Sequence, residues 1–219
     1  MSDFTLVIGN KNYSSWSLRP WLLLQHLQLP FAEIQIPLTQ SDRRARILEH
    51  SPAARVPVLK HGALTIWDSL AIMEYLCEIA GAGLPRERVA RAIARAVSAE
   101  MHSGFGDLRS QWPMNARATG RRTPMTPGLR TDIERVDALW CDCRARFGAS
   151  GAWLFGDYSL ADAMFAPVVL RFRTYGATLS PVAQAYQATT LQDPALLNWL
   201  TAAAAEPGRI EYAEVGTGG

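Results

Sequence analysis

The strongest constraint on this chain is a change of pattern near residue 80. Before that point, short β-prone runs alternate with helix-like stretches, whereas strand signals nearly vanish afterwards. The boundary reads Gly81-Ala82-Gly83-Leu84-Pro85, a Gly/Pro-rich run typical of a linker. We therefore predict an α/β domain over residues 1–80, a linker over 81–86 and an all-α helical-bundle domain over 87–207.

The first region carries the signals of a mixed sheet with helices. Short apolar or alternating runs predict strands over residues 4–8, 31–38, 56–60 and 64–67, with a hairpin turn at His61-Gly62. Helices are expected over 21–29, 41–50 and 69–80. The order is therefore βαβ, helix, ββα.

The second region is dominated by apolar stripes with steps of three and four residues. One stripe runs from Val89 to Trp112, and another from Leu129 to Phe147. Ser159 and Asp162 form a capping box that predicts a third, core helix over 160–175, and a fourth helix is expected to start near residue 193. Residues 113–128 read as a loop, and the glycine-rich residues 208–219 are expected to be a disordered tail.

Composition narrows the classes of function. The net charge of +2 gives no electrostatic case for nucleic acid or an acidic membrane, and no apolar run is long enough to span a bilayer. Cys77, Cys141 and Cys143 form neither a disulfide framework nor a metal-ligand spacing with the histidines, so we expect no metal. No signal peptide is visible at the N-terminus, which favours a cytoplasmic location.

Two serines stand between the first expected strand and the first expected helix. Pro20 lacks an amide hydrogen and is expected in the first helical turn, which puts Ser14 and Ser15 just ahead of the helix N-terminus. Free amides and the positive end of the helix dipole favour an anion there. A hydroxyl at this place can stabilise a thiolate, although an ordinary N-cap serine has the same sequence signature.

Two further motifs have both a structural and a functional interpretation. Pro57 begins an apolar strand after Val56, which marks an edge or a special turn and, if the bond is cis, frees the backbone of Val56 to pair with an extended peptide. Asp68-Ser69 caps a helix, and Ser69 could also hold a carboxylate while the acid pairs with an ammonium group.

Taken together, these motifs resemble the cytosolic glutathione transferase superfamily over roughly residues 4–205. The run from Ser14 to Arg19 is similar to the SSCSWR stretch of the zeta class, although Trp16 stands in place of its cysteine and Leu18 in place of its tryptophan. Val56-Pro57 matches the family's cis-proline turn, and LTIWDSLAIMEYLCE matches the pattern that grips the γ-glutamyl end of glutathione. The resemblance implies a thioredoxin-like first domain and a homodimer.

The resemblance also implies roles for individual residues. Ser14, with Ser15 second and Tyr13 as a further candidate, would activate the thiol of glutathione. Val56, Pro57, Asp68 and Ser69 would bind the peptide, and Arg43, Arg44 or Arg55 would take its glycine carboxylate. The substrate pocket is expected to be lined by Trp16, Phe105 and Trp112, with Met114 and an arginine of the run 171–173 as further candidates. The alternative is that the apolar residues among them belong to the core of the helical bundle, and this alternative is favoured for Phe105.

Three functions remain open from the sequence. The leading expectation is a glutathione S-transferase that conjugates glutathione to a small apolar electrophile. The alternatives are a zeta-like, glutathione-dependent cis-trans isomerase of the maleylacetoacetate type, and a non-catalytic glutathione-binding or regulatory member of the family.

Overall fold

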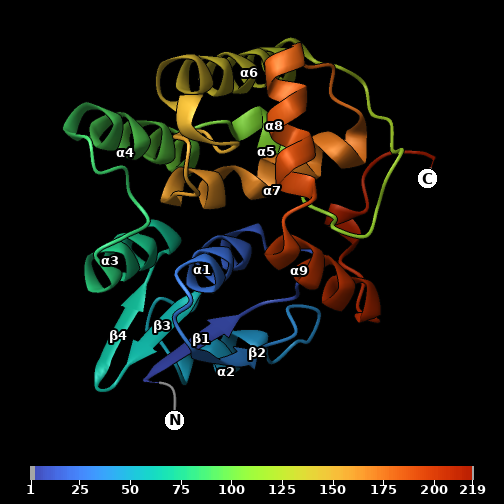
Figure 1. The fold of residues 1–219 in the computed structure, drawn as a ribbon. Helices are drawn as coiled ribbons and strands as arrows, with labels where there is room; N and C mark the ends of the chain where they lie inside the picture. The colour runs from blue at the N-terminus through green and yellow to red at the C-terminus, as the bar shows by residue number, and fades with distance from the viewer. Residues whose placement is uncertain (1–2, 219) are drawn as a thin grey trace.

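The computed structural model describes residues 3–218, which form a sheet-containing region followed by a helical one (Figure 1). The first region comprises β1 (Phe4–Ile8), α1 (Ser15–His26), β2 (Phe31–Gln35), α2 (Arg43–Leu48), β3 (Val58–His61), β4 (Leu64–Trp67) and α3 (Ser69–Ala80). The second comprises α4 (Arg88–Ser103), α5 (Gly106–Gln111), α6 (Pro127–Phe147), η1 (Gly148–Ser150), α7 (Leu160–Tyr175), α8 (Pro181–Leu191), α9 (Pro194–Ala205) and η2 (Glu211–Ala213).

The four strands form one mixed sheet in the order β2-β1-β3-β4. β1 pairs in parallel with β2, and β3 runs antiparallel to both β1 and β4. Alternate side chains of β1 serve two cores: Leu6 and Ile8 join the large core shared with α1 and α3, whereas Val7 joins Ile47 of α2 on the opposite face. The α/β, thioredoxin-like arrangement of the first domain is confirmed, as is the all-helical second region.

Helix α7 is the centre of the helical region and its link to the sheet. All of its residues except Arg173 are buried, and it packs on α1 (Figure 1). Its start is set by the expected capping box: Asp162 accepts hydrogen bonds from the Ser159 amide at 2.8 Å and from the Leu154 amide at 3.0 Å. A helix that is apolar all round must be buried, so α7 fixes the position of the other helices relative to the first domain.

The prediction for the first helix is wrong at its start. α1 begins at Ser15, and Pro20 lies inside the helix rather than in its first turn. A proline this close to the N-terminus removes only the one hydrogen bond that its missing amide would have donated, so the helix continues through it. The consequence is that Ser14 is the N-cap and Ser15 is already helical.

The stripe from Val89 to Trp112 does not form one continuous helix. Gly104 ends α4, and Phe105 adopts a left-handed backbone with φ of 59° before α5 begins. A bulky residue in this conformation is strained, and burial of its ring in the core offsets that cost.

Helix α8 was not predicted, because only Ala183, Tyr186 and Thr190 of its eleven residues are buried and its apolar stripe is weak.

The expected disordered tail is a further correction. Residues 208–218 fold back across the molecule, and Thr217 exchanges two backbone hydrogen bonds with Arg122, at 3.0 and 3.1 Å. Ala213 is buried. The cause is a set of polar anchors that lie far away in the sequence and are described below; Gly219 lies outside the described residues.

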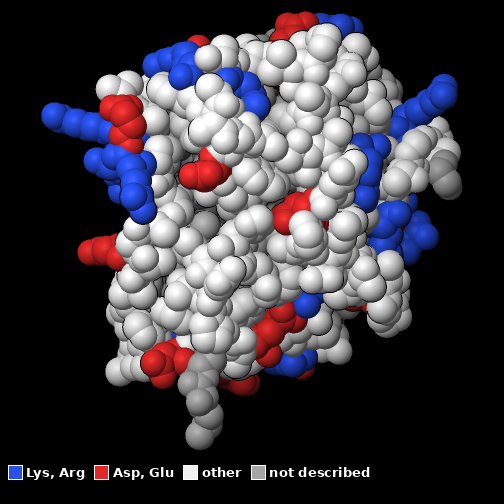
Figure 2. Space-filling view, in the orientation of Figure 1, with Lys and Arg blue, Asp and Glu red and all other residues white. Residues whose placement is uncertain are grey.

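Charge is spread over the visible surface. On the face drawn in Figure 2, basic side chains lie toward the margins and acidic ones are interspersed among uncharged residues.

Among residues 3–218, no helix is both long and apolar enough to cross a membrane, and no group of three or more His, Cys, Asp or Glu side chains could hold a metal ion. The three cysteines are free thiols.

Candidate active site between the two regions

Two adjoining cavities lie beside the N-terminus of α1. The first, of about 610 Å³, is called the arginine cavity here and is lined by Arg43, Arg44, Arg55, Arg109 and Arg171 together with Tyr13, Ser14, Ser15, Met114 and Tyr212. The second, of about 560 Å³, is called the Asp68 cavity and is lined by Asp68, Ser69, Pro57, Trp67 and His102. Trp16, Arg55 and Val56 line both.

The two candidate serines lie at the positive end of α1. Ser14 is the N-cap, Ser15 is the first helical residue, and both are buried in the wall of the arginine cavity. The first turn of α1 contains no acidic residue, so the positive end of its dipole is left for another anion. The amides of Ser15 and Ser17 donate to the carbonyls of Tyr13 and Ser14, at 3.0 and 3.1 Å. The hydroxyl of Ser14 lies 2.7 Å from that of Ser17, which also accepts a hydrogen bond from the Gly9 amide at 3.1 Å.

Tyr13 differs from the serines because its hydroxyl already has partners. It donates to the carboxylate of Glu214 at 2.5 Å and accepts from Arg117 at 3.0 Å. Tyr13 is also part of the lining of the arginine cavity. A hydroxyl occupied in this way is a poorer donor to a ligand than that of either serine.

The Asp68 cavity contains a buried polar group without a partner. Ser69 is 2% exposed, and its hydroxyl has no hydrogen bond among residues 3–218. Asp68 is held in a left-handed conformation with φ of 76°, and its carboxylate accepts from the amides of Leu70 and Ala71 at 2.9 and 3.3 Å. The other oxygen lies 3.1 Å from the His102 ring. An unpaired buried hydroxyl costs free energy, so it marks a place that a ligand can satisfy.

The peptide bond between Val56 and Pro57 is cis, as the resemblance implied. Both residues lie at the Asp68 cavity, and Val56 also reaches the arginine cavity. The proposed peptide-binding residues, from Val56 to Ser69, are therefore gathered at one site although they come from two segments of the chain.

Positive charge dominates the arginine cavity. Its lining contains five arginines and, among the described residues, no Asp or Glu. Arg171 is 5% exposed and donates to the Trp112 carbonyl at 2.6 Å, and burial lowers its pKa to about 10. Guanidinium groups brought together without a carboxylate repel one another, so this wall is suited to an anion.

Arg19 of α1 is a further buried cation, and it interacts electrostatically with Arg171 and Arg109 of the arginine cavity. It is 2% exposed, and its Nε and one terminal nitrogen have no partner among residues 3–218. Burial, followed by the charges of Arg171 and Arg109, lowers its pKa to about 9. The guanidinium lies 4.2 Å from the centre of the Trp16 ring, and Arg109 lies 5.6 Å from the same ring. Trp16 thus stands at the boundary of the two cavities between cationic groups.

The predicted pocket residues are only partly brought together. Trp16 and Met114 line the arginine cavity, as do Arg43, Arg44 and Arg55. Phe105 and Trp112 do not line either cavity, which corrects the pocket role expected for them, and Phe105 belongs to the helical core, the alternative favoured for it from the sequence. Phe105 points into the core from its left-handed turn, and Trp112 stacks on Tyr175 at 5.2 Å and donates to Thr123.

Three residues of the site were not predicted from the sequence. Arg109 and His102 lie within the run from Val89 to Trp112, where the apolar stripe predicted helices but no polar site residue. Tyr212 lies in the segment expected to be disordered. A signal for Arg109 exists only in three dimensions, where it joins Arg171 and Arg19.

Known proteins resemble the chain in both sequence and structure. Residues 13–79 match the family described as glutathione S-transferase, N-terminal domain. A probable maleylacetoacetate isomerase of Caenorhabditis elegans is 33% identical over 173 residues, which cover 76% of this chain and 78% of the relative. A maleylacetoacetate isomerase of Rattus norvegicus is 28% identical over 171 residues, with 76% and 77% covered.

Solved structures show the same fold. A glutathione transferase homologue from Burkholderia, crystallised with bound glutathione, superposes with a TM-score of 0.71 at 24% identity and covers 93% of this chain and 99% of its own. A maleyl pyruvate isomerase, described as a bacterial glutathione S-transferase of the zeta class, gives 0.70 at 23% identity, with 93% and 98% covered. The chain belongs to the glutathione S-transferase superfamily and has zeta-like character, as its motifs implied.

Proposed function

We propose that this protein is a glutathione-dependent cis-trans isomerase that acts on an unsaturated keto diacid. Two of its relatives carry the name maleylacetoacetate isomerase. The observation that carries the proposal is the arginine cavity, which has five arginines and no acidic side chain in its described lining. A dicarboxylate would pair with Arg171, which is buried, and with Arg109, which is partly buried, whereas Arg43, Arg44 and Arg55 are exposed.

Conjugation of a small apolar electrophile, the leading expectation from the sequence, fits the arginine cavity less well. An apolar acceptor would remove water from Arg109 and Arg171 without supplying a partner, and a desolvated charge without a partner is costly. An anionic acceptor gains from the same desolvation, because charge pairs strengthen when water is excluded.

The Asp68 cavity supports glutathione as the co-substrate. The unpartnered Ser69 hydroxyl and the N-terminus of α3 would hold the γ-glutamyl carboxylate, and Asp68 would pair with the adjacent ammonium group. The backbone of Val56 would pair with the extended peptide, and Arg43, Arg44 or Arg55 would take the glycine carboxylate. Bound glutathione would supply a thiolate that adds reversibly to an activated double bond and so permits rotation.

The serines would hold the sulfur in its charged form. Ser17 accepts from the Gly9 amide and can donate its own hydrogen to Ser14, which leaves the hydrogen of Ser14 free to point into the cavity. Together with the helix N-terminus, that hydroxyl would lower the pKa of a bound thiol. Ser15 lines the same wall and is the second candidate.

The acceptor would lie on the other side of the sulfur. Arg109 and Arg171 reach the arginine cavity from α5 and α7, opposite the loop that carries Ser14. Their planar guanidinium groups suit bidentate recognition of a carboxylate. The reacting double bond would then be held between the serines and the arginines.

The test is the conversion of a cis-enedione diacid, followed by its change in absorbance, with glutathione present in catalytic amount. The expected result is a trans product with no net loss of glutathione. Stoichiometric consumption of glutathione with an apolar electrophile and no isomerisation would favour conjugation instead. Retention on glutathione-agarose with no turnover of any acceptor would favour a non-catalytic member. The homodimer and the cytoplasmic location stay predictions.

A further inference from the structure

The segment of residues 208–217, called the strap here, completes the wall of the arginine cavity. It follows α9 and reaches the loop between α5 and α6, where Thr217 pairs with Arg122 (Figure 1). Tyr212 and Ala213 of the strap belong to the lining of the cavity. The site therefore contains residues from near both ends of the described chain.

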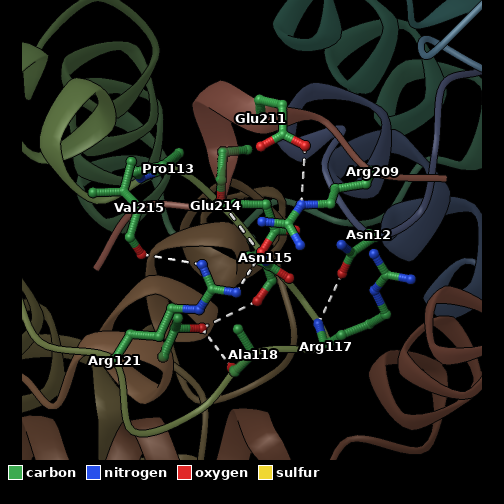
Figure 3. A network of polar contacts seen from close by, with 12 residues as sticks. Asn12, Pro113, Asn115, Arg117, Ala118, Arg121, Arg209, Glu211, Glu214 and Val215 are labelled. Carbon is green, nitrogen blue, oxygen red and sulfur yellow. Dashed lines mark hydrogen bonds and ion pairs between the residues drawn. The ribbon is translucent and has the colours of Figure 1, made fainter. Parts of the chain in front are cut away.

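The strap is fastened by polar contacts rather than by apolar packing (Figure 3). The carboxylate of Glu214 accepts hydrogen bonds from Arg121 and from the hydroxyl of Tyr13. Arg121 also donates to the Val215 carbonyl at 3.1 Å, and Arg117 donates to the Gly208 carbonyl at 3.0 Å. Because Tyr13 precedes Ser14, the strap is tied directly to the loop that carries the candidate catalytic serine.

One residue of this well-fastened segment has no packing of its own. Tyr212 is 77% exposed, and it makes no hydrogen bond or ring contact with any of residues 3–218. The other aromatic rings of the cavity differ, because Trp16 lies against Arg19 and Tyr13 lies near Arg117. An aromatic ring held at the mouth of a cavity without a partner is free to pack on whatever enters.

We infer that Tyr212 is a specificity-determining residue that covers the acceptor, with its ring on the planar, conjugated part of an unsaturated carboxylate held by Arg109 and Arg171. The inference rests on the proposed function for the class of acceptor. The contact of a flat conjugated chain with an aromatic ring adds affinity that a saturated chain of equal charge does not obtain. Charge would thus be recognised by the arginines, and unsaturation by Tyr212.

The test is calorimetric titration of the full chain, saturated with glutathione, with cis,cis-muconate as a planar dicarboxylate probe and adipate as its saturated counterpart. We expect Tyr212→Ala to weaken muconate binding about tenfold and adipate binding much less, and Tyr212→Phe to retain wild-type affinity. Tyr212 is exposed, so its removal leaves the folded protein intact. Glu211→Ala is the matched control, because Glu211 is an exposed neighbour whose carboxylate forms an ion pair with Arg209 and does not line the arginine cavity.

A second measurement follows the strap itself. Hydrogen exchange of residues 208–217 should slow when muconate is added to the wild type, and should not slow in Tyr212→Ala. Equal muconate affinity in Tyr212→Ala and wild type overturns the inference, as does failure of the wild type to bind muconate or equal loss of both probes. If Tyr212→Ala weakens muconate selectively while no cis-enedione is isomerised, the strap's role stands and only the proposed function falls.

Discussion

The two cavities share Trp16, Arg55 and Val56 but differ sharply in the charges that surround these residues. The Asp68 cavity combines an acid, a histidine and an unpaired serine, and all its lining except His102 comes from the first domain. The arginine cavity has five cations and takes Arg109, Arg171 and the strap from the helical region. On the function proposed above, the mixed-charge half would hold the γ-glutamyl end of glutathione, and the cationic half would hold the glycine carboxylate together with the anionic acceptor.

The largest expected effect comes from Ser14, which lies in the wall of the arginine cavity at the N-terminus of α1. Ser14→Ala should lower kcat/KM about a hundredfold, because removal of one preorganised donor to a developing or bound anion has effects of that size. The pH–rate profile should shift to higher pH as the bound thiol loses its stabilisation. Ser15→Ala is the matched comparison and should have a smaller effect. An unchanged pH profile in Ser14→Ala would remove this serine from the mechanism.

Removal of Arg171 from the arginine cavity should change the KM for the acceptor but not the affinity for glutathione. Arg171→Met should raise the acceptor KM about thirtyfold, since it deletes a buried, charged hydrogen-bond donor. The affinity for glutathione should stay the same, which titration calorimetry would check. Arg173→Met is the control on the same helix, because Arg173 donates to the Ala116 carbonyl and does not line the cavity. Equal losses in both variants would mean that α7 had merely been disturbed.

A change in the Asp68 cavity should have the opposite selectivity, lowering the affinity for glutathione and leaving the KM for the acceptor nearly unchanged. Asp68→Asn should weaken glutathione binding about tenfold by removing one charge pair, and should leave the acceptor KM nearly unchanged. Asparagine caps helices as well as aspartate does, so α3 and the melting temperature should be preserved. If the variant instead weakened the acceptor, the division between the two cavities would be wrong.

The smallest expected effect concerns pH and the strap. Burial opposes ionisation of Glu214, but hydrogen bonds from Tyr13 and Arg121 outweigh it and hold its pKa below the ordinary value. Because the folded-state pKa of Glu214 is lower than its unfolded value, the ionised carboxylate stabilises the attached strap fully at pH values above the unfolded pKa. This stabilisation is lost as the pH falls through the lower, folded-state pKa. The protection factors of residues 208–217, which are exchange rates corrected for the intrinsic pH dependence of amide exchange, should therefore change little between pH 8 and 5. A marked loss of protection above pH 5 would contradict this assignment.

The sequence was most informative where a local motif sets a structural boundary. The helices over 69–80 and 160–175 begin and end as predicted, because Asp68 and the Ser159–Asp162 box cap them and their apolar faces are regular. The start of α1 was missed because the usual place for proline is the first turn, and Pro20 is tolerated a little further in. The break at Phe105 has no local signal apart from Gly104.

Residues of the site were harder to predict when they came from distant segments. Ser14, Val56, Asp68 and Ser69 lie in short motifs, whereas Arg109 and Arg171 of the arginine cavity, and Arg19 whose charge acts on both, come from three separate helices. An apolar acceptor was expected because no local pattern indicates that these guanidinium groups meet. The strap was missed for the same reason, since Arg121 and Glu214 are 93 residues apart.

The fastening of the strap also has a consequence for the order of events during synthesis. The elements that form the Asp68 cavity are complete once α4 has been made, whereas the wall that carries Tyr212 emerges from the ribosome only after α9. A nascent chain, or one cut by a protease after Pro207, would retain the peptide-binding half and lack the cover over the acceptor. If Tyr212 covers the acceptor as proposed, selectivity for the unsaturated acceptor is acquired only after the serines and the arginines of the site have been made, and a single cleavage would remove it.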